Sequence, residues 1–325
     1  LRGQPVVLGY YLSGEDRDGI TKGMLPDPAL PMERLRGLPL GATTWRGYSS
    51  NIEALTRAAP AAGFFNSITD EDGVVRSLAL LAADQGQYYE SLALAMFRTA
   101  IGLREIHPGF VNPTPVGTHD LLQSIVLRQD GRTLALPVDQ QLATLIPYRG
   151  PGDAKGGSFR YISASDVLDG VLPPGQLKDQ LVLVGSTAPG LLDLRVTPVG
   201  RTYPGVETHA NVLSAFLDGK SIVRPDYAAG FDVLQLLCAG LLLAVALPLL
   251  SASSAVLLSA SVVSALVGLN LWMYIVQGLA LPLATAVVMS MLAFALNMAY
   301  GYFVESRSKR ELAALFSAYV PPELV

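Results

Sequence analysis

The sequence predicts an α/β domain, a mixed sheet covered by helices, followed by an all-α region of three transmembrane helices. Half of the 325 residues are apolar and the mean hydropathy is +0.38, which is too high for a single soluble domain of this length. The apolar excess is concentrated, because no Asp, Glu, Lys, Arg or His occurs from Val233 to Val304. The preceding residues have the mixed composition of a globular domain that is large enough to bury a core.

The first part of the chain alternates between strand and helix patterns. Strands are expected at the β-rich apolar runs, residues 6–11, 63–68, 74–78, 125–127, 133–136 and 180–185. Helices are expected from Ser91 to residue 97, at 165–168 and at 205–216, the last one closed by Gly219. The Asp-Gly pairs at 72–73 and 130–131 each lie between β-rich runs and predict two hairpins. Strands mixed with helices favour a mixed sheet with helices packed on it.

The start of the chain carries a further expectation. Residues 5–11 form a strand pattern at once, and the residues before them lack the basic start and apolar run of a signal peptide. We therefore expect an upstream signal-anchor helix and some earlier domain sequence.

The charge-free region accommodates three spans, residues 228–250, 254–276 and 279–303. Each has about 23 residues, enough to cross roughly 30 Å of hydrocarbon. The segments lack the polar face that a soluble helical bundle requires, so the lipid bilayer is the expected surrounding. The predicted organisation is a domain at 1–226, a membrane region at 227–304 and a linker helix at 305–325.

Basic residues near the ends of the spans predict the orientation. Arg307, Lys309 and Arg310 follow the third span, and the short loops carry no charge. Positively charged residues accumulate on the cytoplasmic side, so the C-terminus is expected there and the first domain outside the cytoplasm. Arg224, which precedes the first span, argues weakly for the opposite orientation.

The overall charge argues against nucleic-acid binding. The chain has 23 Lys and Arg against 27 Asp and Glu, a net charge of −4, and the residues after Val304 sum to zero. The first domain is therefore acidic and has no basic cluster, whereas nucleic-acid interfaces are basic. Cys238 is the only cysteine and lies in the apolar region, so a disulfide within one chain is excluded.

An acidic turn is the first candidate site. Asp70, Glu71 and Asp72 lie at the tip of the first predicted hairpin. Clustered carboxylates are suitable Ca²⁺ ligands, but the spacing of an EF-hand is absent, and a solvated turn is the alternative interpretation. Arg76 and Arg149 are further candidate polar residues for sensing or structure.

Polar residues at the start of the predicted helix at 205–216 are the second candidate. Glu207 and His209 are two residues apart and cannot both face one ion from a regular helix, which disfavours a metal site. The alternative is a polar network of Glu207, His209 and Asn211 with the loop that begins at Asp193. Ser186 lies in a Gly-Ser-Thr-Ala sequence, which lacks the last glycine of a nucleophile elbow. No catalytic, cofactor-binding or metal-binding residue is assigned.

Apolar residues after the third span follow a one-face helical pattern. The pattern consists of Leu312, Leu315, Phe316 and Tyr319, and Pro321 and Pro322 then end the helix. A helix that continues from the third span could carry a displacement inward, so Phe316, Tyr319 and Pro322 are candidate transduction residues.

The first part of the chain resembles the CHASE type 2 extracellular sensory domain of bacterial cyclases and kinases. The matching stretches are GFFNSITDEDGVVRSLALL at 63–81, SLALA at 91–95, IPYRG at 146–150, SASDVLDG at 163–170, LVLVGSTAPGLLD at 181–193 and TPVGRTYPGVETHAN at 197–211. They cover most of residues 5–225. The resemblance implies a domain outside the bacterial inner membrane, ahead of three membrane helices.

The tail is similar to the segment that precedes class III adenylate or guanylate cyclase domains. That segment commonly reads Phe-x-x-Tyr-Val-x-Pro-Glu, and Phe316, Tyr319, Val320, Pro322 and Glu323 match it. The resemblance implies a receptor-type adenylate cyclase that makes cAMP and diphosphate from ATP and works as a homodimer. Its Mg²⁺ or Mn²⁺ would bind in a catalytic domain that is absent from residues 1–325.

Other functions are left open by the residues. The same sensor could be attached to a histidine or Ser/Thr kinase, although Pro321-Pro322 does not continue into a phosphoacceptor helix. A structural membrane protein and an extracytoplasmic hydrolase using Ser186 and His209 are the remaining alternatives. No pattern selects the chemistry of the extracytoplasmic ligand.

Overall fold

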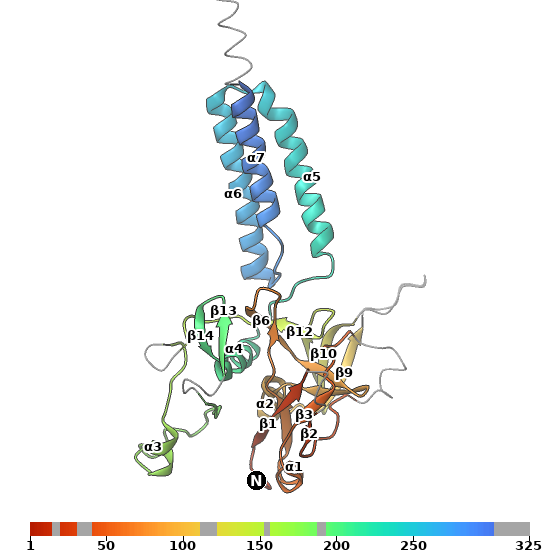
Figure 1. Ribbon diagram of the computed structural model, residues 1–325, viewed down its shortest axis with the longest axis vertical. Helices are drawn as coiled ribbons and strands as arrows, with labels where there is room; N and C mark the ends of the chain where they lie inside the picture. Colours follow the sequence, from red (N-terminus) through yellow and green to blue (C-terminus); the bar gives the residue numbers. More distant parts are fainter. Residues whose placement is uncertain (15–19, 31–40, 111–121, 153–156, 187–192, 302–325) are drawn as a thin grey trace, which may run out of the picture. The chain divides into compact units, whose positions relative to one another are not determined.

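The computed structural model describes residues 1–14, 20–30, 41–110, 122–152, 157–186 and 193–301. The chain divides into two compact units, Leu1–Val223 and Arg224–Val325, and each is considered by itself. The first unit contains several small sheets and four helices among its described residues, and the second is helical (Figure 1). The predicted mixed α/β class of the first unit is confirmed.

The largest sheet contains the first strand of the chain. Its order is β2(Thr21–Lys22), β3(Gly47–Ser49), β1(Val7–Ser13) and β4(Ala61–Phe64). Strand β1 runs parallel to β4, with Val7 opposite Ala61, and antiparallel to β3. Tyr10 and Leu12 point into a buried cluster with Phe64, whereas Tyr11 is exposed on the other face. The alternation along β1 thus leaves one face of the sheet open.

Hairpins supply the other sheets. The strands are β5(Ile68–Thr69), β6(Val75–Ala79), β7(Leu81–Asp84), β8(Gln87–Glu90), β9(Glu105–Phe110), β10(Leu122–Gln129), β11(Arg132–Pro137) and β12(Ala143–Leu145). Both predicted hairpins are confirmed, as β5 pairs with β6 and β10 with β11. Asp130 and Gly131 both have positive φ, the geometry that Asp-Gly favours in two-residue turns. The β7–β8 hairpin turns at Gln85-Gly86 and was not predicted.

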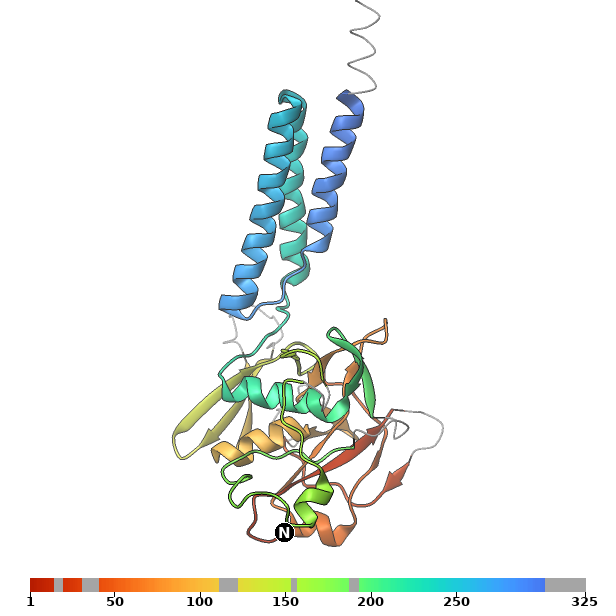
Figure 2. The same ribbon diagram turned by 90° about the vertical axis from the view of Figure 1, so that its left-hand side faces the viewer.

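Two helices form the main core of the first unit with these strands. They are α2(Leu92–Ile101) and α4(Gly205–Leu217), which run side by side (Figure 2). Phe97 of α2 and Phe216 of α4 have ring centroids 5.3 Å apart. The predicted cap is present, because the Ser91 hydroxyl accepts a hydrogen bond from the Leu94 N–H at 3.4 Å. Two shorter helices, α1(Glu53–Ala58) and α3(Ala164–Leu168), lie outside this core.

The predicted strand at 180–185 is wrong. These residues belong to no strand and pair with no neighbour in the described part of the chain. Val184 is 88 % exposed, and about half of Leu181 and Val182 is exposed. An apolar β-rich run predicts a buried strand only where a partner strand supplies backbone hydrogen bonds, and the described sheets offer none here.

The second unit contains α5(Ala228–Ala246), a short 3₁₀ turn η2(Leu247–Leu249), α6(Ala252–Gln277) and α7(Ala284–Tyr300). Two segments, Ala228–Leu249 and Ala252–Gln277, are long and apolar enough to span a membrane. Helix α7 is apolar and has 17 residues. It begins at Ala284 rather than at residue 279, because Pro282 lacks the N–H that a helix interior needs.

Candidate functional site

The hairpin before α4 positions the polar start of that helix. It consists of β13(Leu194–Thr197) and β14(Gly200–Pro204). The Gly205 N–H donates to the Asp193 carbonyl at 2.8 Å, and the Asp193 carboxylate accepts from the Val206 N–H. A Cβ at residue 205 would collide with that carboxylate, so glycine permits the approach. The loop at Asp193 is therefore bonded to Gly205 and Val206 at the start of this helix.

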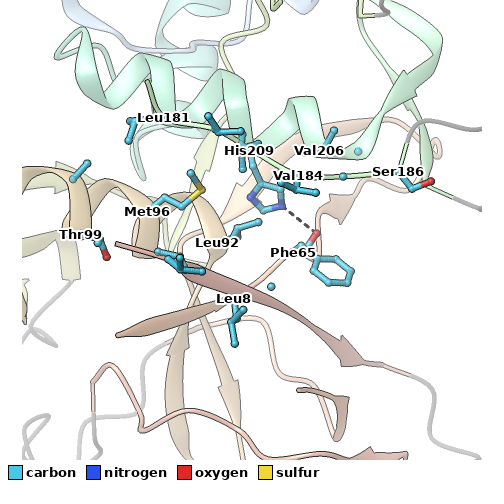
Figure 3. Close-up of a pocket in the computed structure, with 18 of the residues that line it drawn as sticks. Leu8, Phe65, Leu92, Met96, Thr99, Leu181, Val184, Ser186, Val206 and His209 are labelled. Atoms are coloured by element: carbon cyan, nitrogen blue, oxygen red, sulfur yellow. Dashed lines mark hydrogen bonds between the residues drawn. The ribbon is translucent and has the colours of Figure 1, made fainter. Parts of the chain in front are cut away.

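A cavity of about 950 Å³ lies beside this helix start (Figure 3). It is formed by the beginning of β1, one face of α2, the extended segment 180–186 and the start of α4. Its lining is mainly apolar, with Leu8, Leu92, Met96 and Val206 among the residues that contact it. The volume and the apolar lining are typical of a small-molecule site.

His209 is the buried polar residue of the cavity wall. Its side chain is 1 % exposed, and Nε2 lies 3.2 Å from the Phe65 carbonyl oxygen. An imidazole beside a carbonyl donates from that nitrogen, so Nδ1 carries the lone pair. Within the described residues Nδ1 has no hydrogen-bond partner. Burial lowers the pKa of His209 to about 4, with a smaller contribution from the Arg195 charge, so the ring is neutral near pH 7.

Asp193 and Arg195 form the second polar part of the lining. The Arg195 guanidinium lies 3.7 Å from the Asp193 carboxylate. Burial raises the pKa of Asp193, and the Arg195 charge opposes that shift. Arg195 Nε is buried and has no hydrogen-bond partner among the described residues. Both residues line the cavity, and each has one buried polar atom without a hydrogen-bond partner among the described residues.

Asn211 is the centre of a separate network behind the cavity. Its Oδ1 accepts from the Arg149 backbone N–H at 2.9 Å, and its Nδ2 donates to the Tyr203 hydroxyl at 2.7 Å. The Arg149 side chain forms an ion pair with Asp218 at the other end of α4. Glu207 is 2 % exposed and accepts a hydrogen bond from the Tyr161 hydroxyl. Asn211, Arg149 and Glu207 therefore anchor α4, whereas Gly205, Val206 and His209 are the residues of this helix that line the cavity.

Two carboxylates of the acidic turn pair with an arginine from the same hairpin. Arg76 donates to both carboxylate oxygens of Asp72, at 2.9 and 2.7 Å, and to Asp70 at 2.6 Å. This arrangement lowers the pKa of Asp72 to about 2, chiefly through the hydrogen bonds from Arg76. A guanidinium among these carboxylates favours the solvated turn over a Ca²⁺ site. The structure describes no group of three His, Cys, Asp or Glu side chains that could hold a metal ion.

The other predicted residues do not form an active site in the described part. Ser186 lines the cavity, but the bonded nitrogen of His209 faces Phe65 and its other nitrogen has no partner, so no Ser–His pair is formed. Phe316, Tyr319 and Pro322 lie outside the described residues. Sequence reasoning missed Met96 and Leu92, because their helical pattern is that of ordinary core residues.

Comparisons with known proteins identify the family. The model of the CHASE2 domain matches residues 4–250, which includes the whole first unit from Gln4 onward and helix α5. No curated protein and no solved structure matches the chain. The chain belongs to the CHASE2 domain family, whose members are extracellular sensory domains of signalling proteins.

Proposed function

We propose that residues 1–325 are the sensing and membrane-spanning part of a receptor-type class III adenylate cyclase in the bacterial inner membrane. The first unit lies outside, three helices cross the bilayer, and the C-terminus is cytoplasmic and leads to a dimeric catalytic domain. The CHASE2 match, the two long apolar helices and the apolar α7 support the anchoring. The similarity of residues 311–325 to the segment before cyclase domains supports the output.

The observation that carries this proposal is the short link between the sensor and the first apolar helix. Only residues 218–227 lie between the end of α4 and the start of α5. Helix α4 provides His209 to the cavity wall, and these ten residues connect it to α5. A change in the cavity that moves α4 would therefore be passed to α5 through this link.

We place the extracytoplasmic ligand in the cavity beside His209. Its mainly apolar lining fits a small apolar molecule. His209 Nδ1 and Arg195 Nε are buried and lack partners among the described residues, so a small turn of these side chains toward the cavity would let them bind one neutral polar group, such as a hydroxyl or an amide. Met96→Trp fills the cavity, so it should remove the change in cAMP production caused by an extract that activates the unmodified complete protein. A preserved change would place the ligand elsewhere.

The output is tested with the complete protein. Cells that express it should produce cAMP, and deletion of residues 1–223 should change the basal rate while leaving catalysis possible. As a control for expression, the membrane-embedded protein is quantified in both strains. Absence of cAMP from the complete protein would refute the cyclase assignment and leave the kinase alternative.

The relay, meaning the transfer of movement from the third span to the cytoplasmic helix, is tested by inserting one, two and three residues after Phe303. One residue turns an α-helix by about 100°, so a rigid connection predicts cAMP rates that vary with helical phase. Equal rates across the series would contradict a rigid connection.

The orientation is tested by thiol labelling. In a Cys238→Ala background, Ser165→Cys in the first unit should react with a membrane-impermeant maleimide in intact cells. Ser308→Cys, after the third span, should react only after permeabilisation. The reverse pattern would place the first unit in the cytoplasm.

A further inference from the structure

The helices of the second unit are arranged around the last one. Helix α7 packs along both α5 and α6, whereas α5 and α6 scarcely touch each other. The first apolar helix therefore contacts the last described helix directly, although α6 separates them in the sequence.

The face of α5 that is buried contains one polar side chain. Gln235, Ala239 and Leu243 are buried at a spacing of four residues, while Val233 and Leu237 on other faces are exposed. Ala239 and Leu243 fit an apolar interface. A glutamine in such a stripe requires a hydrogen-bond partner, because an unpaired amide in hydrocarbon is costly.

The partner is the backbone just before α7. Gln235 Nε2 donates to the Pro282 carbonyl oxygen at 3.3 Å. Residues 279–283 are not helical, so their carbonyls lack the bonds that a helix would supply. Asn270 of α6 donates to the neighbouring Leu281 carbonyl at 2.9 Å. The segment before α7 is thus held by two amide side chains, one from each neighbouring helix.

Two further bonds connect α5 and its 3₁₀ turn to α7. Thr285, in the first turn of α7, donates to the Asp232 carboxylate. Asn297, near the other end of α7, donates to the Leu247 carbonyl at 3.4 Å. Between these ends a Cβ at Gly240 would lie 3.5 Å from Met289 Cε, in ordinary van der Waals contact, so Gly240 faces α7 there.

We propose that Gln235 is a positioning residue that sets the register of α7 on α5. A displacement of α5 then passes directly to α7, and α6 serves as the connecting helix. The role in signalling depends on the proposed function, but the helix pairing does not.

The pairing is tested by cross-linking in membranes of the complete protein. Gly240→Cys and Met289→Cys are introduced in a Cys238→Ala background, and the two thiols are linked with a short bifunctional thiol-reactive cross-linker. Adding Gln235→Met, which preserves side-chain length but removes the donor, should slow cross-linking about threefold, as expected for the loss of one interhelical hydrogen bond. A cross-link from Gly240→Cys to Ala293→Cys, one turn further along α7, should become faster.

The matched control is Asn270→Leu, which removes the corresponding bond from α6. It should leave the Gly240→Cys to Met289→Cys cross-link unchanged. Unchanged cross-linking in Gln235→Met, or an equal loss in Asn270→Leu, would overturn the assignment.

The signalling role has its own readout. Gln235→Met should change basal cAMP production about twofold or more at equal expression, and Asn270→Leu should not. Unchanged cAMP in Gln235→Met would refute the relay, even where cross-linking confirms the pairing. A complete protein that makes no cAMP would refute the proposed output, and the cross-linking result would still decide the register.

Discussion

The neutral, buried His209 makes the stability of the first unit depend on pH. Burial lowers the pKa of His209 to about 4 in the folded protein, against an ordinary value of about 6.5 in an unfolded chain. The unfolded state therefore binds the proton more readily. The contribution of the neutral His209 ring to the free energy of unfolding is fully present above pH 6.5 and is lost as the pH falls toward 4.

The magnitude follows from the difference between the two pKa values. A difference of about 2.5 pKa units corresponds to roughly 3 kcal/mol once the pH is well below 4. Between pH 7.5 and pH 5 the free energy of unfolding should fall by about 2 kcal/mol from this residue alone. Carboxylates also titrate in this range, so the effect of His209 must be isolated by comparison.

The comparison uses His209→Gln, which does not titrate and keeps a side-chain N–H near the Phe65 carbonyl. Trp45 packs against Phe64 in the first unit, with ring centroids 5.8 Å apart, and reports its unfolding by fluorescence. Replacing Trp272, the other tryptophan, by Phe removes the signal from α6. Urea unfolding of the detergent-solubilised chain is measured at pH 7.5 and at pH 5. An equal loss of stability in both proteins would refute the neutral, buried imidazole.

Two further substitutions test the packing of the first unit with the same fluorescence assay. Arg98→Met should cost about 3–5 kcal/mol, because it leaves the buried Glu90 carboxylate without its cation, and adding Glu90→Gln should restore most of that loss. Gly63→Val should cost about 1–3 kcal/mol, since a Cβ there would lie 2.6 Å from the Leu92 backbone, whereas Gly200→Ala, which meets open space, should have little effect.

The local elements of the first unit could be predicted from sequence because short-range chemistry determines them. Gly131 takes a positive φ at the turn of its hairpin, and Ser91 caps α2 with its own side chain. These features depend on neighbours within a few residues. The cavity could not be predicted in this way, because Leu8, Met96 and His209 come from three segments that are far apart in the chain.

Sequence reasoning alone located the apolar helices and the turns of two hairpins. The absence of charge from Val233 to Val304 is a property of composition, and hydrocarbon excludes charge whatever the neighbouring helices are. The matching stretches of the first part also supported a resemblance to the CHASE type 2 domain, and the CHASE2 match confirms it.

The tertiary structure alone decided three matters. The apolar run at 180–185 lines a cavity instead of joining a sheet, His209 donates to the Phe65 carbonyl, and α5 packs against α7. Each depends on a partner that is distant in sequence. A strand needs the backbone of another strand, the protonation of a buried imidazole depends on what surrounds it, and an all-apolar helix carries no polar face to show which neighbour it packs against.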